Sequence, residues 1–538
     1  MTNVEASGFG ELLLRAARRW PRRTACAFPD GRTTYAQLWR VACEAGRRLF
    51  ELGVRPGEHV GILVPNSARF LAAFFGASLC GALPVPINTR FRGDELPYVA
   101  EHADLVALVT SADVSINKKG ERVDYLDRLV EAFPDLEAEG VLLTSAAPRL
   151  RAIIAFGAPS RAWAVPWADD DGGDRTPGVT VPDWIQQGDP DAPAMMLYTS
   201  GTTSRPKGVL IPAAAVISGT VSSMIDRLGV DADDVVWSPA PMCHIGAFVA
   251  VVAALAVGAT FLSAPYFDAD EAVDLLARER ATVAYAGLPA FYFDIIGQLA
   301  ATGRTLPDLR LLTTAAAAAE IERVRRGLPS VLQVSVTGST ELCGSICTSD
   351  LDDSPEQRAA TSGRPIAGVE LSIRDEAGRH VEDGQVGELW VRGSCLPVGY
   401  YKNSAPLLTG SPDAGWFRTG DLGALTDGRF SYRGRLKDMV RVGGENVAAA
   451  EIEHYLVRHP DVIAAAAVAA PDERLGEVPA VFVQVTAGSE LSAEDIIAFC
   501  RAGLASFKVP RTVRFVDEWP MSATKIDKQR LRQLVVAG

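Results

Sequence analysis

The sequence predicts an α/β protein in which a large N-terminal domain of parallel or mixed sheets covered by helices precedes a small α+β domain. Helical and strand patterns alternate through the first third of the chain, which is typical of parallel sheets with covering helices. The motif GRLKD, at residues 434–438, is followed by about 100 residues with a pattern of their own, enough for a small domain. The 538 residues, 48% of them hydrophobic, supply ample core for both domains.

The first third supplies the elements of the predicted parallel sheet. Residues 34–53 carry apolar side chains at helical spacing and end on a glycine, which predicts a helix. The continuous apolar run HVGILVP, at residues 59–65, suits a strand that is buried on both faces. Residues 67–81 then predict a second helix, and residues 82–88 (ALPVPIN) predict the next strand.

Residues 245–262 (IGAFVAVVAALAVGATFL) are the segment most similar to a membrane span, with no charge in 18 residues. That length is at the lower limit for a helix that crosses a bilayer. Because Gly258 interrupts the run and a short β-prone stretch follows, we expect a buried helix, a turn and a buried strand instead.

Further along the chain, composition marks two boundaries. A polar stretch rich in glycine and proline, at residues 169–190, predicts a link on the surface. The boundary at GRLKD divides the chain into a domain of residues 1–434 and a domain of residues 439–538. The segments EIEHYLVRH, VIAAAAVAA, AVFVQV and EDIIAFCRAGL predict helix, strand, strand and helix in the second domain.

The charge and cysteine content narrow the function classes. The formal net charge of −13 argues against a nucleic-acid binder, because binding along a phosphate backbone needs an excess of basic residues. The eight cysteines form no C-x-x-C pair, so we expect reduced thiols rather than a zinc site or a disulfide framework. The N-terminal residues show no apolar signal core, and we expect a cytoplasmic protein.

A loop rich in small polar residues lies at residues 197–208 (LYTSGTTSRPKG). Its backbone N–H groups and hydroxyls can donate to phosphate oxygens, and Lys207 adds a positive charge. The loop is not that of P-loop NTPases, because no Gly-Lys-Ser/Thr sequence ends it. Taken alone, it would also fit an ordinary surface loop.

Seven further motifs follow the same order as in a known family. They are PMCHIGAF (241–248), TGSTE (337–341), GRPIAG (363–368), GELWVRG (387–393), GWFRTGD (415–421), GRLKDMVRVGGENV (434–447) and PMSATKIDK (520–528). With the phosphate loop they resemble the adenylate-forming superfamily of acyl-CoA synthetases, peptide-synthetase adenylation domains and luciferases. The resemblance extends from about Thr34 to the last residues, and it implies a small distorted β-barrel in the large domain and mobility of the small one.

The resemblance implies a nucleotide site. The phosphates of ATP would contact Thr199, Ser200, Gly201, Thr202, Thr203 and Lys207, and the nucleotide would also contact Ala316, Thr337, Gly338, Ser339 and Thr340. Glu341 would ligate Mg²⁺, which suits a hard cation beside phosphate oxygens. Asp421 would accept hydrogen bonds from both ribose hydroxyls, and Arg435 would support the same ribose.

The resemblance implies that Lys525 acts in the first chemical step. Attack of a carboxylate on the α-phosphate brings two anions together, and a lysine that touches both would stabilise the transition state. In this family the small domain then rotates about a hinge, here residues 435–438 with Asp438 as the pivot. The rotation would remove Lys525 and present Gly443 and Gly444, where a pantetheine thiol needs close approach to the backbone.

The acyl group would lie near His244, a gate residue, and Phe248, with Ala315 and the backbone of Gly338 beside it. Three positions depart from the family. Thr337 stands where a tyrosine usually stacks on adenine, Ser204 replaces a frequent glycine, and TTAAAAAE (313–320) replaces a Gly-Gly-Ala-Pro turn. We expect a turn rebuilt with ordinary φ angles, with drift in an alanine-rich protein as the alternative. A second hypothesis is that one half-reaction is weakened or that the pocket is reshaped for an unusual acid. The small side chains leave room for a bulky apolar or polycyclic acid, such as a terpenoid or steroid-derived one.

The resemblance therefore implies an acid–CoA ligase that uses ATP, Mg²⁺ and coenzyme A. Such an enzyme converts a small-molecule carboxylic acid to acyl-AMP with release of pyrophosphate, and then to the thioester. One alternative hands the acyl group to a partner enzyme or an acyl carrier protein. A kinase, which would release ADP, and a non-catalytic nucleotide-binding relative are two more. The oligomeric state stays open, with a homodimer as one option.

Overall fold

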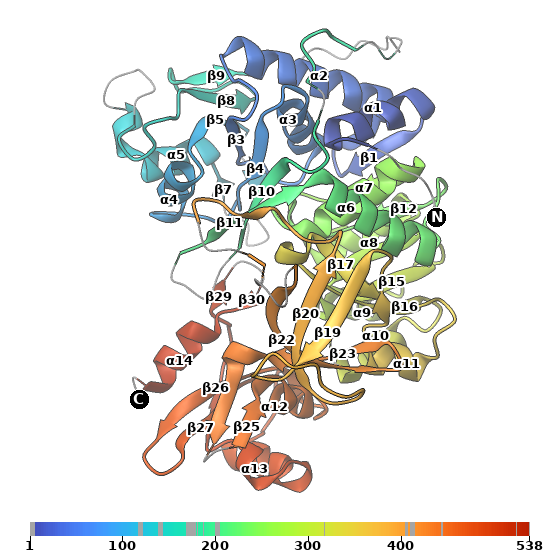
Figure 1. Cartoon of the computed structure of the whole chain (residues 1–538), viewed down its shortest axis with the longest axis vertical. Helices are drawn as coiled ribbons and strands as arrows, with labels where there is room; N and C mark the ends of the chain where they lie inside the picture. Colours follow the sequence, from blue (N-terminus) through green and yellow to red (C-terminus); the bar gives the residue numbers. More distant parts are fainter. Residues whose placement is uncertain are drawn as a thin grey trace.

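A computed structural model describes most of the chain (Figure 1). The described residues are 6–113, 115–116, 122–137, 144–167, 179, 181–186, 188–199, 205–316, 318–403, 407–408, 415–442, 445–522 and 525–536. A large part built from the N-terminal four-fifths of the chain lies above a smaller part that ends at the C-terminus. The stretch predicted as a link, residues 169–190, falls largely outside the described residues.

The first sheet of the large part is parallel throughout, in the order β4-β3-β5-β8-β9. Its strands are β3 (His59–Ile62), β4 (Leu83–Pro86), β5 (Leu105–Ser111), β8 (Ala152–Phe156) and β9 (Ala164–Pro166). The helices around it are α2 (Tyr35–Glu51), α3 (Ala68–Leu79), α4 (Glu95–His102) and α5 (Tyr125–Ala132). All seven residues of β5 are buried, because α3 packs on one face of the sheet while α4 and α5 cover the other. The predicted parallel pairing is confirmed.

The predicted helices begin and end where their caps lie. Thr34 forms a capping box with Gln37 at the start of α2, and Ser67 accepts a hydrogen bond from the Phe70 N–H at the start of α3. The two helices pack closely where each has a glycine. A Cβ on Gly76 would lie 2.3 Å from the Ala45 Cβ, so only glycine allows this approach.

The second sheet has nine strands in the order β18-β17-β16-β15-β14-β12-β13-β1-β2. Its strands are β1 (Thr24–Phe28), β2 (Gly31–Thr34), β12 (Val235–Trp237), β13 (Thr260–Leu262), β14 (Val283–Gly287), β15 (Leu311–Thr314), β16 (Leu332–Ser339), β17 (Gly344–Thr348) and β18 (Arg364–Pro365). Pairing is parallel from β1 to β16 and antiparallel at both edges, which makes the sheet mixed. The helices of this region are α1 (Phe9–Arg19), α6 (Ala213–Thr220), α7 (Ile245–Val257), α8 (Ala269–Arg278), α9 (Pro289–Thr302), α10 (Ala318–Gly327) and α11 (Pro355–Ala360), with a π-helix at Val221–Arg227.

The uncharged segment 245–262 folds as predicted. It forms α7, a turn at Gly258 with a φ of 84°, and β13 in the middle of the second sheet. None of the described helices combines the length and the apolar character that a bilayer crossing requires. Burial of α7 inside the large domain satisfies its apolar side chains instead.

Antiparallel strands complete the large part. One sheet has the order β19-β20-β22-β23 and another the order β10-β11-β21. The strands are β10 (Pro193–Thr199), β11 (Lys207–Pro212), β19 (Val369–Arg374), β20 (Gly387–Gly393), β21 (Gly399–Tyr400), β22 (Phe417–Thr426) and β23 (Arg429–Arg435). The resemblance implied a small distorted barrel here; the described strands form these two sheets, and no described pairing joins β19 to β23.

The small part has its own sheet, in the order β25-β24-β27-β26 with β28 paired to β27. Its elements are β24 (Met439–Val442), β25 (Glu445–Ala448), α12 (Ala449–Leu456), β26 (Val462–Asp472), β27 (Gly476–Val485), α13 (Ala493–Gly503), β28 (Thr512–Phe515), β29 (Met521–Ser522), β30 (Lys525–Ile526) and α14 (Lys528–Val536). Its hydrophobic core is a separate cluster of residues between Val440 and Leu531. A 3-10 turn, Leu436–Asp438, connects β23 of the large part to β24.

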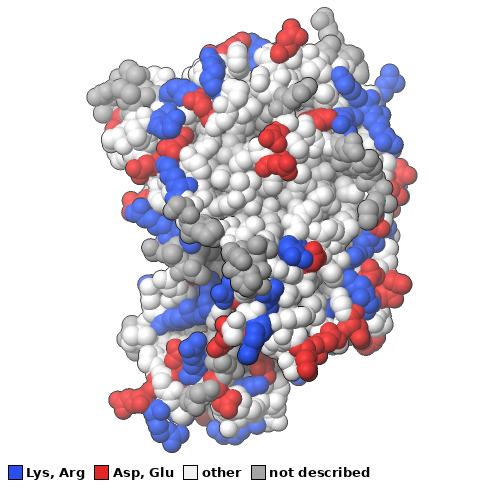
Figure 2. Space-filling model, viewed as in Figure 1, with Lys and Arg blue, Asp and Glu red and all other residues white. Residues whose placement is uncertain are grey.

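All eight cysteines are free thiols, as the sequence predicts. Figure 2 shows acidic and basic side chains interspersed over one face of the described molecule.

Candidate functional site

The phosphate-loop motif joins two paired strands. Thr199 ends β10 and Lys207 begins β11, and the two residues are direct partners in the antiparallel ladder. The Lys207 ammonium lies 5.4 Å from the ring centroid of Tyr400, on β21, which pairs with β11. The predicted loop residues Ser200, Gly201, Thr202 and Thr203, together with Ser204, lie outside the described residues.

Glu341 lies directly beside this loop. It belongs to the 3-10 turn Thr340–Leu342 that follows Ser339, the last residue of β16, and its Oε1 accepts a hydrogen bond from the Thr199 hydroxyl at 3.2 Å. The Tyr400 hydroxyl also donates to the Glu341 carboxylate, and burial together with that negative charge raises the pKa of Tyr400. The structure thus brings Thr199, Lys207 and Glu341 together across 142 residues, and adds Tyr400, which the motifs did not indicate.

Strand β16 requires glycine at residue 338, near its end. A Cβ on Gly338 would lie 2.0 Å from the carbonyl oxygen of Gly344 on the neighbouring strand β17. Thr337, the departure from the family, donates a hydrogen bond to the Ser362 hydroxyl at 2.6 Å. Thr337 is therefore anchored to the segment before β18, where a tyrosine would present a ring.

The alanine run begins at the end of β15. The Ala315 N–H donates to the Gly287 carbonyl at 2.7 Å, and the Ala315 side chain is exposed. Neither Ala315 nor Ala316 has a positive φ, so the prediction that this turn is rebuilt with ordinary φ angles is confirmed at both residues. Ala317, in the middle of the run, lies outside the described residues.

Asp421 and Arg435 form the second half of the site. They are direct partners on β22 and β23, and the Arg435 Nε lies 2.9 Å from the Asp421 Oδ1. Burial is the largest single influence and opposes the charge on Arg435, but Asp421, Tyr432, Glu341 and Asp438 together outweigh it. The pKa of Arg435 is therefore raised. Because Glu341 contributes to that shift, the two halves of the site interact electrostatically.

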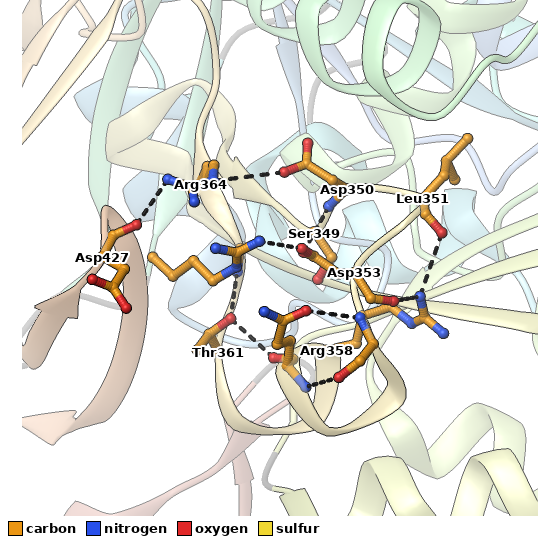
Figure 3. Close-up of polar contacts among 12 residues, drawn as sticks. Ser349, Asp350, Leu351, Asp353, Arg358, Thr361, Arg364 and Asp427 are labelled. Atoms are coloured by element: carbon orange, nitrogen blue, oxygen red, sulfur yellow. Dashed lines mark hydrogen bonds and ion pairs between the residues drawn. The ribbon is translucent and has the colours of Figure 1, made fainter.

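Ion pairs hold the sheet that carries Asp421 against the end of β17 (Figure 3). Asp353, with 2% of its side chain exposed, pairs with Arg429 at the start of β23. Arg364 donates to the Asp427 carbonyl at 2.8 Å and lies 3.8 Å from the Asp350 carboxylate. The acidic group of Asp350, Asp352 and Asp353 is thus largely matched by arginines and serves the packing of these strands.

The side chain of Asn66 fixes the turn before α7 through two hydrogen bonds. Buried Asn66 donates to the Ala240 carbonyl at 2.9 Å and accepts from the Met242 N–H at 2.8 Å. His244 follows as the N-cap residue of α7. A cavity beside this turn is lined by Val64, Pro65, Asn66, Ile87, Thr89, Arg90, Pro239, Pro241, Met242, Cys243, Pro265, Tyr266, Phe267 and Phe291.

Phe248 does not face this cavity. Its ring is 1% exposed and lies 4.5 Å from the ring of Phe74 on α3, measured between centroids. Phe9 and Phe70 surround it further. This packing places Phe248 in the hydrophobic core of the large part, and its contact with the acyl group stays a prediction.

The predicted pivot Asp438 contacts the small part, which also carries the terminal motif. The Asp438 carboxylate pairs with Arg532 at 2.9 Å and with Lys528 at 3.7 Å. Lys525 begins β30, which pairs with β29 in a hairpin on the side of the small part that faces the large part (Figure 1). The Lys525 side chain is not described, and the expected thiol-site residues Gly443 and Gly444 lie outside the described residues.

Comparison with known proteins identifies the family to which the chain belongs. Residues 13–401 match the model of the AMP-binding enzyme family, and residues 451–525 match that of the AMP-binding enzyme C-terminal domain. The chain belongs to the AMP-binding enzyme family. Its resemblance to the adenylate-forming superfamily is therefore confirmed.

Relatives of the whole length specify the reaction class. An indoleacetate–CoA ligase from Aromatoleum aromaticum is 32% identical and covers 98% of each chain. A 3-[(3aS,4S,7aS)-7a-methyl-1,5-dioxo-octahydro-1H-inden-4-yl]propanoyl:CoA ligase from Rhodococcus jostii is 32% identical over 97% of each chain. Among solved structures, the amide bond synthetase McbA from Marinactinospora thermotolerans is 27% identical, with a TM-score of 0.80 over 97% of this chain and 99% of that chain. The predicted fold and the prediction of an AMP-forming acid–thiol ligase are confirmed at the level of this family.

Proposed function

We propose that this member of the AMP-binding enzyme family converts a bulky, apolar or polycyclic carboxylic acid to its acyl-AMP and then to its CoA thioester. One observation carries the proposal. Thr199, Lys207 and Glu341 converge at the phosphate loop, while Asp421 and Arg435 form a charged pair within electrostatic reach of Glu341. A loop for phosphates on one side and an acceptor for a ribose diol on the other fit one nucleotide.

The donor set beside the loop fits Mg²⁺. The Glu341 carboxylate and the Thr199 and Tyr400 hydroxyls are oxygen groups, which this hard cation prefers. When bound, Mg²⁺ would neutralise part of the phosphate charge. Thr340, in the same turn as Glu341, would donate its hydroxyl to phosphate, and Lys207 would hold the β- and γ-phosphates. Ser200 to Thr203 would add backbone and hydroxyl donors.

In the first step, a carboxylate oxygen of the acid attacks the α-phosphorus, and the bond to the pyrophosphate oxygen breaks. Two anions must approach each other, so the step needs a cation at the reacting atoms. We assign that role to Lys525, with Asp421 and Arg435 fixing the ribose and Ala316, Thr337, Gly338 and Ser339 contacting the rest of the nucleotide. In the second step, the thiol sulfur attacks the acyl carbon and AMP leaves.

The two steps would use two positions of the small domain. We divide the chain into residues 1–434, a hinge at residues 435–438 and a lid at residues 439–538, with Asp438 as the pivot. The separate hydrophobic core of the small part supports its movement as a unit. In the second position, Gly443 and Gly444 would border the thiol, where missing Cβ atoms permit close approach.

Small residues support the proposed size of the acid. The Ala315 methyl group is exposed, and a Cβ on Gly246 or on Gly287 would meet no atom within 4 Å. The relatives that act on indoleacetate and on the indenyl propanoate support the same size class. His244, Ala315 and the Gly338 backbone would then border the acyl group.

A panel of acids tests the function. Pyrophosphate release is measured with indoleacetate, bicyclic propanoates, acetate and amino acids, each with and without CoA. We expect release with bulky cyclic acids, and a thioester product only when CoA is present. Faster turnover of acetate or amino acids would refute the substrate class, and absence of pyrophosphate with every acid would refute adenylation. Release of ADP would indicate a kinase. Acyl-AMP that CoA does not consume would point to a carrier-protein thiol.

A further inference from the structure

The terminal helix α14 is joined to the hinge by a small group of charged side chains. One oxygen of the Asp438 carboxylate accepts from the Arg532 guanidinium at 2.9 Å, and the other lies 3.7 Å from the Lys528 ammonium. The Asp438 side chain is only 14% exposed, whereas those of Arg532 and Lys528 are 35% and 22% exposed. The residue at the proposed pivot is thus held by two cations from a single helix.

Arg532 contacts both sides of the pivot. The same terminal nitrogen, Nη2, donates to the Asp438 carboxylate and, at 3.1 Å, to the carbonyl oxygen of Lys437. A change in the backbone torsions at Asp438 moves the Lys437 carbonyl relative to the elements that follow it. Both hydrogen bonds therefore cannot survive a large rotation at this residue. Arg532 opposes the rotation while the bonds last.

The helix α14 is firmly attached to the small domain. Lys528 also pairs with Glu453 on α12 at 2.6 Å, and Leu531 is completely buried in the core of this domain. The helix begins two residues after β30, whose first residue is Lys525. The contact at Asp438 therefore connects the pivot to the element that directly follows the proposed catalytic lysine.

These contacts are weak enough to break each time the lid moves. Partly exposed ion pairs contribute little, and a contact of this kind shifts a two-state equilibrium by roughly two- to fivefold. That is enough to bias the lid position without locking it. A fully buried pair would slow every cycle of opening.

We infer that Arg532 is a positioning residue for the reaction. By holding Asp438 and the Lys437 carbonyl, Arg532 favours the lid position of this structure, in which the Lys525 hairpin faces the large domain. The inference rests on the proposed two-step function. On this inference, Arg532 affects the balance between the two half-reactions. The helix α14 then contributes to the catalytic cycle as well as to the packing of the small domain.

The test separates the half-reactions in Arg532→Met, which keeps an apolar stem but removes both donors. We expect acid-dependent pyrophosphate release to fall about two- to fivefold, while conversion of supplied acyl-AMP to thioester stays constant or rises. Arg532→Lys restores a charge near Asp438 but lacks the planar group, so we expect partial recovery. Arg530→Met is the matched control, since exposed Arg530 lies on the same helix and its side chain contacts Gln533.

A second measurement does not depend on activity. Limited trypsin digestion cuts after the exposed Lys437, and loss of the bond to its carbonyl should speed that cleavage in Arg532→Met but not in Arg530→Met. An equal fall of both half-reactions, or no change in either half-reaction or in cleavage, would overturn the inference. If the unmutated enzyme releases no pyrophosphate with any acid, the proposed function fails, and cleavage at Lys437 still decides whether Arg532 restrains the hinge.

Discussion

The proposed nucleotide site and the proposed hinge use the same chemistry, a carboxylate paired with an arginine, in different settings. Asp421 and Arg435 are direct partners on adjacent strands, and the surrounding ladder fixes their distance. Asp438 and Arg532 lie 94 residues apart and meet through side chains alone. The first pair keeps its geometry as long as the sheet exists, whereas the second can break without loss of any strand. Groups that must stay fixed are held by backbone register, and groups that must move are held by side chains.

The structure around the two pairs also differs in how firmly it is fixed. The strands that carry Asp421 and Arg435 are further fixed by the buried pair of Asp353 and Arg429. The proposed hinge has a 3-10 turn of three residues between the two parts, in which Leu436 and Lys437 are exposed. We therefore expect changes in the large domain to weaken nucleotide binding, and changes in the small domain to alter one step more than the other.

The largest effect is expected at Lys525, which belongs to the moving part. Lys525→Ala should slow acyl-AMP formation about 10²- to 10³-fold, the usual effect of removing one stabilising donor from a transition state. Conversion of supplied acyl-AMP to thioester should stay near the unmutated rate, because the lysine would have left the site by then. Single-turnover assays of each step measure both rates. An equal loss in both would contradict the division between a fixed and a moving part.

A smaller effect concerns stability of the small domain at low pH. Burial, together with the positive charges of Lys528, Arg433 and Arg458, lowers the pKa of His454 from its usual 6.5 to about 4. The unfolded chain therefore binds more protons than the folded one between these values, so stability falls as pH falls from about 6.5 toward 4. The loss should amount to roughly 2–3 kcal/mol. Thermal unfolding at pH 7 and pH 4.5 should show a smaller pH-dependent loss in His454→Gln, and an identical loss would refute the assignment.

Asp421→Asn probes the fixed pair. The amide keeps the shape but loses the charge that attracts Arg435 and the acceptor capacity for a ribose diol. Loss of a charged hydrogen bond costs about 1.5–3 kcal/mol, so kcat/KM for ATP should fall roughly 10- to 100-fold. Asp427→Asn, in the exposed turn between the same strands, is the control. Thioester formation from supplied acyl-AMP, whose ribose occupies the same place, should fall as well, and a loss limited to adenylation would count against a fixed ribose contact.

The smallest expected effect is a lower KM for ATP. Thr337→Tyr replaces a hydroxyl bonded to Ser362 with a ring at the position where relatives stack one on adenine. Stacking contributes about 0.5–1.5 kcal/mol, so the KM for ATP should fall by roughly two- to tenfold. Thr337→Ser keeps the hydroxyl and serves as the control. A rise in KM for the tyrosine variant would show that the bond to Ser362 matters more than a ring.

Most of the secondary structure could be predicted because its signals are local. The capping box at Thr34 and the glycine at residue 258 each mark an end of a helix within a few residues. The motifs likewise indicated that Thr199, Lys207, Glu341, Asp421 and Arg435 belong together. Spacing could not indicate that Tyr400 donates to Glu341 or that Phe248 faces the core, because each depends on which distant element lies opposite.

The sequence by itself determined the alternation of helices and strands, the family and the types of group at the nucleotide site, since all of these are encoded in short stretches of chain. Tertiary structure decided how the antiparallel strands group into two sheets, that the carboxylates of Asp350 and Asp353 pair with arginines, and that α14 meets Asp438. These contacts join residues tens to hundreds of positions apart. No local pattern specifies them, because they exist only once packing has chosen which strands and helices become neighbours.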